Sequence, residues 1–164
     1  MIKAKQARRI VRATRKAGRE MGLNPLAVVV LDAGGHPMAF EREDGASAGR
    51  FEIAAGKAFG AVMLGMAGKA QMARAEQQAY FVNAMNGLFG GRFVPVPGGI
   101  LLRNAKGRVV GAVGVTGDTS DNDAAAGLAG HGDGSDLFLE AGHLGLHLLG
   151  LLHHAHQVFH RDLL

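Results

Sequence analysis

The chain contains no cysteine, few aromatic residues and no long apolar segment. Without cysteine it can form no disulfide bond and no thiolate–metal site, and a reducing compartment is permitted. No apolar stretch approaches the roughly 20 residues that a membrane-spanning helix needs. The basic residues near the start are not followed by the apolar core of a signal peptide. We therefore expect a cytoplasmic protein without a membrane span.

The chain is rich in glycine and carries a concentration of positive charge near its start. Its 26 glycines are about twice the average share. They are spread among apolar runs, so they predict turns and close backbone contacts. The net charge of +4 conceals two parts, because residues 1–20 carry +7 and the rest of the chain carries −3. Binding of nucleic acid or of an anionic membrane would rest on that one segment, so we expect no nucleic-acid partner.

Apolar periodicity predicts alternating helices and strands in the first half of the chain. Residues 3–22 carry apolar side chains at helical spacing, with most basic residues on the other faces, which indicates an amphipathic helix. Residues 26–32 form a β-branched run typical of a strand buried on both faces, and residues 38–41 would be its hairpin partner. Two further helices are expected over residues 51–66 and 69–85.

The second half predicts another hairpin and a last helix. Residues 100–103 and 108–115 alternate around a turn in which Gly107 suits a positive φ, and Thr119 or Ser120 would cap the following helix. The order helix–strand–strand–helix–helix–strand–strand–helix predicts an α+β fold, with a central antiparallel sheet flanked by helices. The sequence shows no internal repeat and no domain linker, so this fold would be a single domain.

Four motifs carry a family resemblance when they are taken in order. They are the strand and turn over residues 26–36, the polar element 42–45, the Pro-Gly-Gly of 97–99 and the glycine-rich segment 109–118. As a set they resemble the GlcG/HbpS-like haem-binding family of small oligomeric domains. The resemblance implies a profilin-like, three-layer fold and haem or another tetrapyrrole as the ligand. It also implies a homo-oligomer, which the glycine-rich strand and the Gly/Ala-rich helices favour as well.

The polar element after the first hairpin contains a candidate binding pair. Arg42 can hold a carboxylate through two parallel hydrogen bonds, and Asp44 can orient the guanidinium or accept a proton. On spacing alone, a surface turn with a local ion pair is the better interpretation. The resemblance reverses that preference, because the family has an Arg-x-Asp-Gly element here, next to its proposed pocket.

Lys57, Gly98 and Gly99 complete the candidate ligand-binding residues. Lys57 lies among alanines in a predicted helix. Such a lysine usually extends its ammonium group to water, but a partly buried one would have a lowered pKa and could bind a propionate or another anion. Gly98 and Gly99 would let the backbone approach a flat or anionic group, and a tight turn explains them equally well. The family carries a Lys-Ala pair at the position of Lys57.

His36 is the candidate metal ligand. It lies in the first turn, and imidazole suits haem iron as an axial ligand. A solvent-exposed turn histidine without a ligand role is the simpler interpretation, and the family uses no uniform axial ligand. Phe51, Phe59 and Phe93 are candidate apolar contacts for a bound ring.

The same residues permit an alternative function, as an enzyme or accessory protein that acts on a small organic acid. Arg42 would hold the carboxylate, and Asp44 or Lys57 would be the general acid or base. Family members also occur beside catabolic enzymes, so the natural ligand and the presence of turnover both stay open. A haem protein would show a Soret band, whereas an acid-binding protein would be stabilised by carboxylates.

Two other motifs are interpreted structurally. Gly111, Gly114 and Gly117 lack the spacing of a dinucleotide-binding loop and lie within a strand pattern, so they would make room for another backbone or subunit. Residues 116–123 are rich in oxygen ligands but lack the last glutamate of a calcium-binding EF-hand loop. We interpret them as a helix-capping loop.

The resemblance ends near residue 126. We expect a GlcG/HbpS-like domain over residues 1–126 and an atypical His/Leu-rich segment over 127–164. Seven of the eight histidines lie in residues 131–160, some three or four apart, a spacing that could bind metal on a helix. We favour a single-base frameshift, because residues 131–138 back-translated and read one base later approach the family's usual continuation. A nucleotide sequence in which no one-base correction restores such an ending would refute this.

Overall fold

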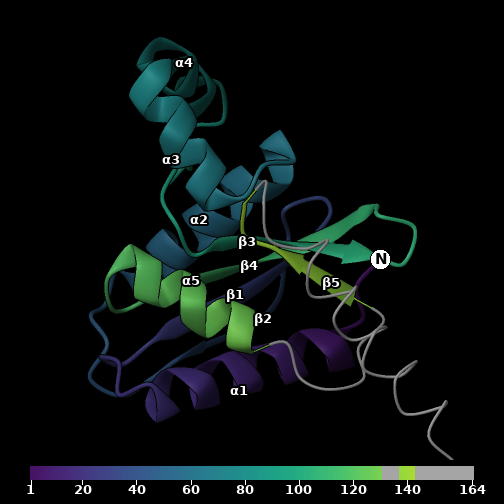
Figure 1. Ribbon diagram of the computed structural model, residues 1–164, viewed down its shortest axis with the longest axis vertical. Coiled ribbons are helices and arrows are strands. Elements are labelled where there is room, and N and C mark those ends of the chain that lie inside the picture. Colours follow the sequence, from purple (N-terminus) through teal and green to yellow (C-terminus); the bar gives the residue numbers. More distant parts are fainter. Residues whose placement is uncertain (131–136, 143–164) are drawn as a thin grey trace, which may run out of the picture.

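A computed structural model describes residues 1–130 and 137–142 of the chain. In this part of the chain an antiparallel sheet of five strands, in the order β2-β1-β4-β3-β5, has helices on both faces (Figure 1). The elements in chain order are α1 (Ala4–Glu20), β1 (Ala27–Asp32), β2 (Pro37–Arg42), α2 (Arg50–Leu64), α3 (Gly68–Gln77), α4 (Ala79–Leu88), β3 (Gly99–Asn104), β4 (Val109–Thr116), α5 (Ser120–Ala129) and β5 (Leu137–Glu140). The predicted α+β fold with a central antiparallel sheet is confirmed.

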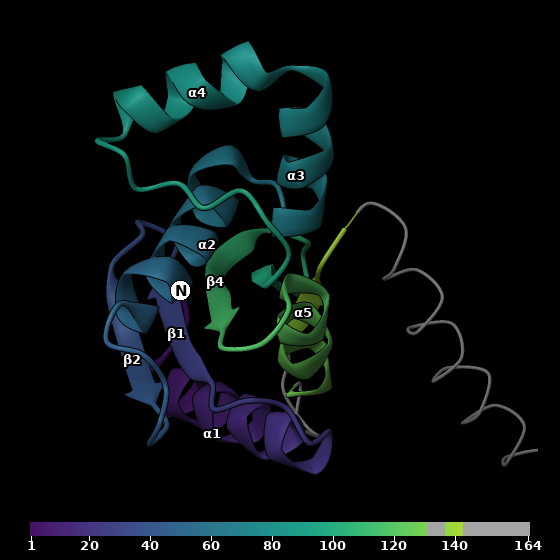
Figure 2. The ribbon, with the colours of Figure 1, turned by 90° about the vertical axis from the view of Figure 1, so that its left-hand side faces the viewer.

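The central strand β1 shows how the sheet separates two cores. Successive side chains of a strand point to opposite faces. Val28 and Val30 therefore belong to the core beneath α1 and α5, whereas Val29 and Leu31 belong to the core beneath α2. Figure 2 shows α1 and α2 on opposite sides of the strands. This is the three-layer arrangement, and it explains why β1 is apolar at successive positions.

Gly114 in β4 lets α2 lie directly on the sheet. A Cβ at this position would overlap the carbonyl group of Ala54 in α2. The neighbouring Ala58 is also small and fully buried. A Cβ at Gly111 would likewise overlap the carbonyl group of Leu31 in β1. These two glycines make room for the chain's own backbone, so they give no support to a contact between copies.

One predicted helix is two helices in the structure. Residues 69–85 were expected to be continuous, but Gln78 has φ −139° and ψ 58° and separates α3 from α4. After the break, the Arg74 guanidinium lies over the Phe81 ring, 3.9 Å from its centroid. The sequence has no glycine or proline at the break, and helical periodicity does not predict the cation–π contact across it, which joins side chains seven residues apart.

The strand β5 was not predicted. It pairs antiparallel with β3, with Leu102 opposite Leu139. Leu137 and Leu139 are buried in the core beneath α1 and α5. The sheet thus includes residues beyond position 126, where the family resemblance was expected to end. The division into residues 1–126 and 127–164 stays a prediction.

Two hypotheses about the C-terminal segment lie outside the described residues. The proposed histidine pairs and most of the proposed frameshifted segment fall in residues 131–136 and 143–164. Among the described helices, no single one is long and apolar enough to cross a bilayer. The pair α2 and α3 meets the length and composition criteria only as a unit bent by 78°.

Candidate functional site

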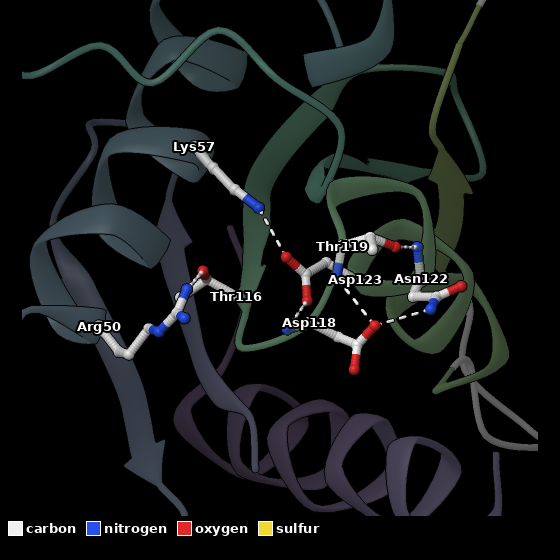
Figure 3. Close-up of polar contacts among 7 residues, drawn as sticks. All are labelled: Arg50, Lys57, Thr116, Asp118, Thr119, Asn122 and Asp123. Carbon is white, nitrogen blue, oxygen red and sulfur yellow. Dashed lines mark hydrogen bonds and ion pairs between the residues drawn. The ribbon is translucent and has the colours of Figure 1, made fainter. Parts of the chain in front are cut away.

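The candidate site is built around a buried ion pair between two helices. Lys57 extends from α2 past the end of β4, and its Nζ donates to Asp123 Oδ2 of α5 at 2.8 Å (Figure 3). The two side chains are only 3% and 1% exposed. Removing two charges from water to this extent is costly, so the pair needs well-placed partners to be tolerated.

Burial disfavours the charged form of both Lys57 and Asp123. Loss of hydration lowers the pKa of Lys57, and the hydrogen bond and charge of Asp123 only partly offset this. Loss of hydration also raises the pKa of Asp123, against the opposing effect of Lys57. The nearby charge of Arg50 lowers both pKa values. Loss of hydration thus opposes the charged form of both side chains, and their contact with each other opposes that effect.

The loop before α5 holds Asp123 in position. The Asp118 backbone N–H donates to Asp123 Oδ1 at 3.0 Å, so both carboxylate oxygens are engaged. Thr119 caps the helix as predicted, since its hydroxyl accepts from the Asn122 backbone N–H at 3.3 Å. The Asp118 carboxylate accepts from the Asn122 side chain and from the backbone N–H groups of Asn24 and Thr119, which lowers its pKa to about 2.

Arg50 adds a second cation to the site. Its Nη1 donates to the Thr116 hydroxyl at 2.8 Å, on the same side of the sheet end as Lys57 (Figure 3). Thr116 is buried, and Arg50 is half-buried. Within the described residues Arg50 forms no ion pair with a carboxylate. Of the two cations at the site, Lys57 is thus paired with the Asp123 carboxylate, whereas the Arg50 guanidinium bonds to a hydroxyl group.

Gly98 and Gly99 pack against Lys57. Gly98 has φ +105°, and a Cβ there would lie 3.0 Å from Lys57 Nζ. A Cβ on Gly99 would overlap the Lys57 backbone carbonyl. The structure thus brings three of the predicted site residues together. The close approach that these glycines permit is toward the protein's own lysine.

Arg42 and Asp44 lie nearby at the same end of the sheet. Ala27 of β1 pairs with Arg42 on one side and with Thr116 on the other. Arg42 is therefore two strand spacings, about 10 Å, from the Arg50–Thr116 contact. Its Nη1 donates to the Ala46 carbonyl at 2.5 Å. Asp44 is exposed, and no described residue bonds to its side chain.

His36 lies at the opposite end of β1 from these residues. The six residues of β1 separate the two ends, which is about 17 Å at a rise of about 3.3 Å per residue. The His36 ring Nδ1 is 3.2 Å from Asp32 Oδ1, and the side chain is 78% exposed. Asp32 also accepts from the backbone N–H groups of Gly34 and His36, which lowers the Asp32 pKa and shapes the turn.

The aromatic residues are divided between the core and the surface. Phe59 and Phe93 are buried and form a cluster with Phe89, so they are not available to a ligand. Phe51 follows Arg50 in α2 and packs edge-on against Phe40, with 4.8 Å between ring centroids. Phe40 is 37% exposed. Of the three predicted apolar contacts, Phe51 alone lies beside the cationic site.

Sequence reasoning missed Arg50 and the role of Asp123. Arg50 is seven residues before Lys57, so the two residues lie on one face of α2, two turns apart. Asp123 was interpreted only as part of a capping loop. A signal was present, because a lysine within an apolar helix face needs a carboxylate partner, and residues 116–123 supply several. Which carboxylate it would be depended on the tertiary fold. Among the described residues, no cluster of three metal-ligating side chains occurs.

The comparison with protein families identifies the chain. The family described as haem degrading protein HbpS-like matches residues 2–131. The chain belongs to the HbpS-like family. No significant match is found among curated proteins.

Solved structures agree with this assignment. The crystal structure of HbpS is 27% identical, covers 79% of this chain and 86% of its own, and superposes with a TM-score of 0.69. A double mutant of Streptomyces reticuli HbpS is also 27% identical, covers 79% of this chain and 84% of its own, and has a TM-score of 0.67. A PduOC:heme complex has a TM-score of 0.70 at 20% identity and covers 83% of this chain and 94% of its own, which shows the shared fold.

Proposed function

We propose that this protein is a small-ligand-binding domain whose ligand is haem or a related tetrapyrrole. Two findings support the proposal. The chain belongs to a family described as haem degrading, and the PduOC domain that shares its fold crystallised with heme. Within the chain, one observation supports the placement of the ligand, namely the Arg50 guanidinium, which bonds to the Thr116 hydroxyl and to no carboxylate among the described residues.

The propionate side of a tetrapyrrole fits this end of the sheet. Arg50 is half-buried, bonded to a hydroxyl group and without a carboxylate partner among the described residues. A guanidinium in this state binds a carboxylate through charge-assisted hydrogen bonds. Phe51 and the part-exposed Phe40 lie beside it and offer an apolar surface to the ring. Arg42 and Asp44 would form the outer edge of this site, while Gly98 and Gly99 hold Lys57 beneath it.

The candidate axial ligand for haem iron, His36, does not belong to the Arg50 site. His36 fits an axial ligand chemically, because a carboxylate at Nδ1 orients the ring as in other metal-binding histidines. It lies about 17 Å from the cationic end, so the two groups do not serve one haem within one copy of the chain. Haem, when bound, supplies redox chemistry at iron. The residues at the Arg50 end act by binding and orienting its carboxylates.

The alternative of an organic-acid enzyme or accessory protein is not favoured by the family assignment. Asp44 and Lys57 were its candidate general acids and bases. Lys57 is engaged with Asp123 and sealed beneath Gly98, so in this conformation it offers no open face to a small substrate. Asp44 is exposed on the outer side of a turn.

A cytoplasmic location and a homo-oligomeric state belong to the same proposal. Both follow from the sequence interpretation and the family. Cell fractionation tests the location. The oligomeric state is measured by light scattering on the purified, haem-free protein.

The direct test is a titration of the haem-free protein with haemin and, in parallel, with iron-free protoporphyrin IX. We expect a saturable, shifted Soret band with haemin. We also expect protoporphyrin IX to bind with similar affinity, because the proposed contacts are to the propionates and to the ring. A flat response to both would refute a tetrapyrrole ligand. Binding of haemin alone would place the ligand at iron-coordinating residues and refute the Arg50 site.

A further inference from the structure

The outward face of α1 carries a line of basic side chains. The buried side of the helix, which includes Ala7, Ile10 and Val11, packs on the core. At about 100° per residue, the basic residues of the opposite side fall within an arc of about 100°. They are Lys5, Arg8, Arg9, Arg12, Lys16 and Arg19. Figures 1 and 2 show α1 along one border of the molecule, at the far end from α4.

The two halves of this line differ in their partners. In the second half, Lys16 pairs with Glu20, and Arg19 pairs with Glu43. In the first half, the four basic residues of positions 5–12 form no ion pair within the described chain. We call these four the basic stripe, and they are Lys5, Arg8, Arg9 and Arg12. Three of them are exposed and Arg9 is half-buried, so the stripe presents unneutralised positive charge to the surroundings.

The folding of α1 does not favour a basic stripe at this position. Arg8 and Arg9 lie three and four residues after Lys5 and before Arg12, and like charges at these spacings destabilise a helix. The start of a helix also favours anionic groups, whereas the first turn of α1 contains Lys5 and no acidic residue. An anionic partner at the stripe would relieve both effects.

The charge of the whole chain directs such a partner to this face. Residues 1–20 carry +7 and the rest of the chain carries −3. An anionic surface therefore attracts the α1 side of the protein and repels the remainder, which orients the protein as it approaches.

The composition of α1 favours a lipid surface over a nucleic acid. Apart from the buried Thr14, the helix has no aromatic residue, asparagine, serine or threonine. Its one glutamine, Gln6, accepts a hydrogen bond from the Lys3 backbone N–H. The groups that stack on bases or read their edges are thus missing from the stripe. A basic amphipathic helix of this kind is typical of proteins that bind a membrane surface.

We propose that the basic stripe of α1 is a docking surface for an anionic phospholipid membrane. The stripe extends about 10 Å from Lys5 to Arg12 at about 1.5 Å per residue, and a flat layer of lipid phosphates contacts it along this whole length. The apolar side of α1 packs on the sheet and does not enter the bilayer, so the attachment is electrostatic and reversible. Each basic residue near an anionic membrane strengthens the attachment about fivefold.

The test is co-sedimentation of the whole, haem-free chain with lipid vesicles. Vesicles of equal parts phosphatidylglycerol and phosphatidylcholine should bind the wild type, and vesicles of phosphatidylcholine alone should not. Binding should be lost in about 1 M salt, which screens charges beyond about 3 Å.

Two pairs of substitutions test where the membrane binds. Lys5→Gln with Arg12→Gln removes two charges from the stripe and should weaken binding to the anionic vesicles about 25-fold. Lys69→Gln with Arg108→Gln removes the same two kinds of charge from exposed positions outside α1, and this matched control should bind like the wild type. Glutamine is nearly as good a helix former as lysine and arginine. Thermal melts should therefore show the stripe variant to be no less stable than the wild type.

Three results would overturn the proposal. A wild type that does not sediment with anionic vesicles at low salt would exclude a membrane partner. Equal losses of binding in the two variant pairs would show that net charge, and not the stripe, drives attachment. Random-sequence duplex DNA that displaces the protein from the vesicles at equal phosphate concentration would assign the stripe to nucleic acid.

The inference is independent of the tetrapyrrole, because α1 contributes no residue to the Arg50–Lys57 site. Both variant pairs should give the wild-type haemin titration. A protein that binds haemin but no vesicles would refute the docking surface alone, and one that binds vesicles but no haemin would refute the tetrapyrrole ligand alone.

Discussion

The end of the sheet near Arg50 and the helix α4 invert the usual distribution of charged and apolar residues in opposite ways. At the sheet end, Lys57 and Asp123 are charged groups removed from water. On α4, Tyr80 and Leu88 are apolar groups left in water. Burying the two charges costs free energy, whereas the exposed apolar side chains forgo the stabilisation that burial would give. The difference shows where to look for function, because each region departs from what folding alone would select.

The two regions also differ in how they are supported. The Lys57–Asp123 pair has a surrounding set of partners, in which Asp118, Thr119 and Gly98 fix the carboxylate and the lysine. The outer face of α4 has no such partners among the described residues. We therefore expect changes at the sheet end to affect stability strongly, and changes on the outer face of α4 to leave it nearly unchanged.

The largest expected effect is that of Lys57→Met. It leaves the Asp123 carboxylate buried without its cation, and we expect a loss of about 3–5 kcal/mol in the free energy of unfolding, measured by urea denaturation. The double variant Lys57→Met with Asp123→Leu should recover most of this loss. Lys69→Met, at an exposed lysine of α3, is the control and should change stability by less than about 0.5 kcal/mol. Equal stabilities of the Lys57 and Lys69 variants would contradict the claim that the buried Asp123 carboxylate depends on Lys57 as its counter-ion.

Gly98→Ala should have the next largest effect. Both Gly98 and Gly107 have positive φ, +105° and +73°, so alanine is strained at either position. At Gly98 the new Cβ would also lie 2.6 Å from the Val115 carbonyl oxygen and 3.0 Å from Lys57 Nζ, whereas at Gly107 nothing lies within 4 Å. We expect about 1–3 kcal/mol from strain at such positions, with the larger loss at Gly98. A Gly107→Ala variant that is the less stable of the two would show that Gly98 does not press on Lys57.

A smaller effect is expected from the capping loop in acid. The pKa of Asp118 is lowered from 3.8 to about 2 by hydrogen bonds from Asn122, Asn24 and Thr119. A lowered pKa in the folded state means that the stabilisation is complete above pH 3.8 and is lost as the pH falls toward 2. Thermal melts over this range should show a steeper decline for the wild type than for Asp118→Asn. Asp121→Asn, at an exposed carboxylate in the first turn of α5, is the control and should retain the wild-type slope.

The smallest effect on stability is expected on α4. Leu88→Ala should change the free energy of unfolding of dilute, monomeric protein by less than about 0.5 kcal/mol, because the side chain is already in water. Val82→Ala, on the buried face of the same helix, should cost more, since it removes methyl groups from the core. Equal losses at the two positions would mean that the outer face of α4 is covered within the monomer.

Local patterns predicted most of the fold. The β-branched run of β1, the turn at Gly107 and the cap at Thr119 act over a few residues, and each lies where it was expected. The strand β5 was missed because it depends on pairing with the distant strand β3. The break at Gln78 was missed because no glycine or proline marks it. The site followed the same division. Lys57 was selected from its apolar neighbours together with the family resemblance, whereas Arg50 and the pairing with Asp123 became visible only when α2 and α5 met at the sheet end.

The central claim is that Arg50 binds the carboxylates of a tetrapyrrole, and the most direct test is a haemin titration of Arg50→Ala, with Arg12→Ala as the control. Arg12 is an exposed arginine of α1. A charge-assisted hydrogen bond contributes about 1.5–3 kcal/mol, so we expect Arg50→Ala to weaken binding by about tenfold to a hundredfold. The control should match the wild type, and Arg42→Ala should lose less than Arg50→Ala. An Arg50→Ala protein that binds haemin as tightly as the wild type would contradict the account.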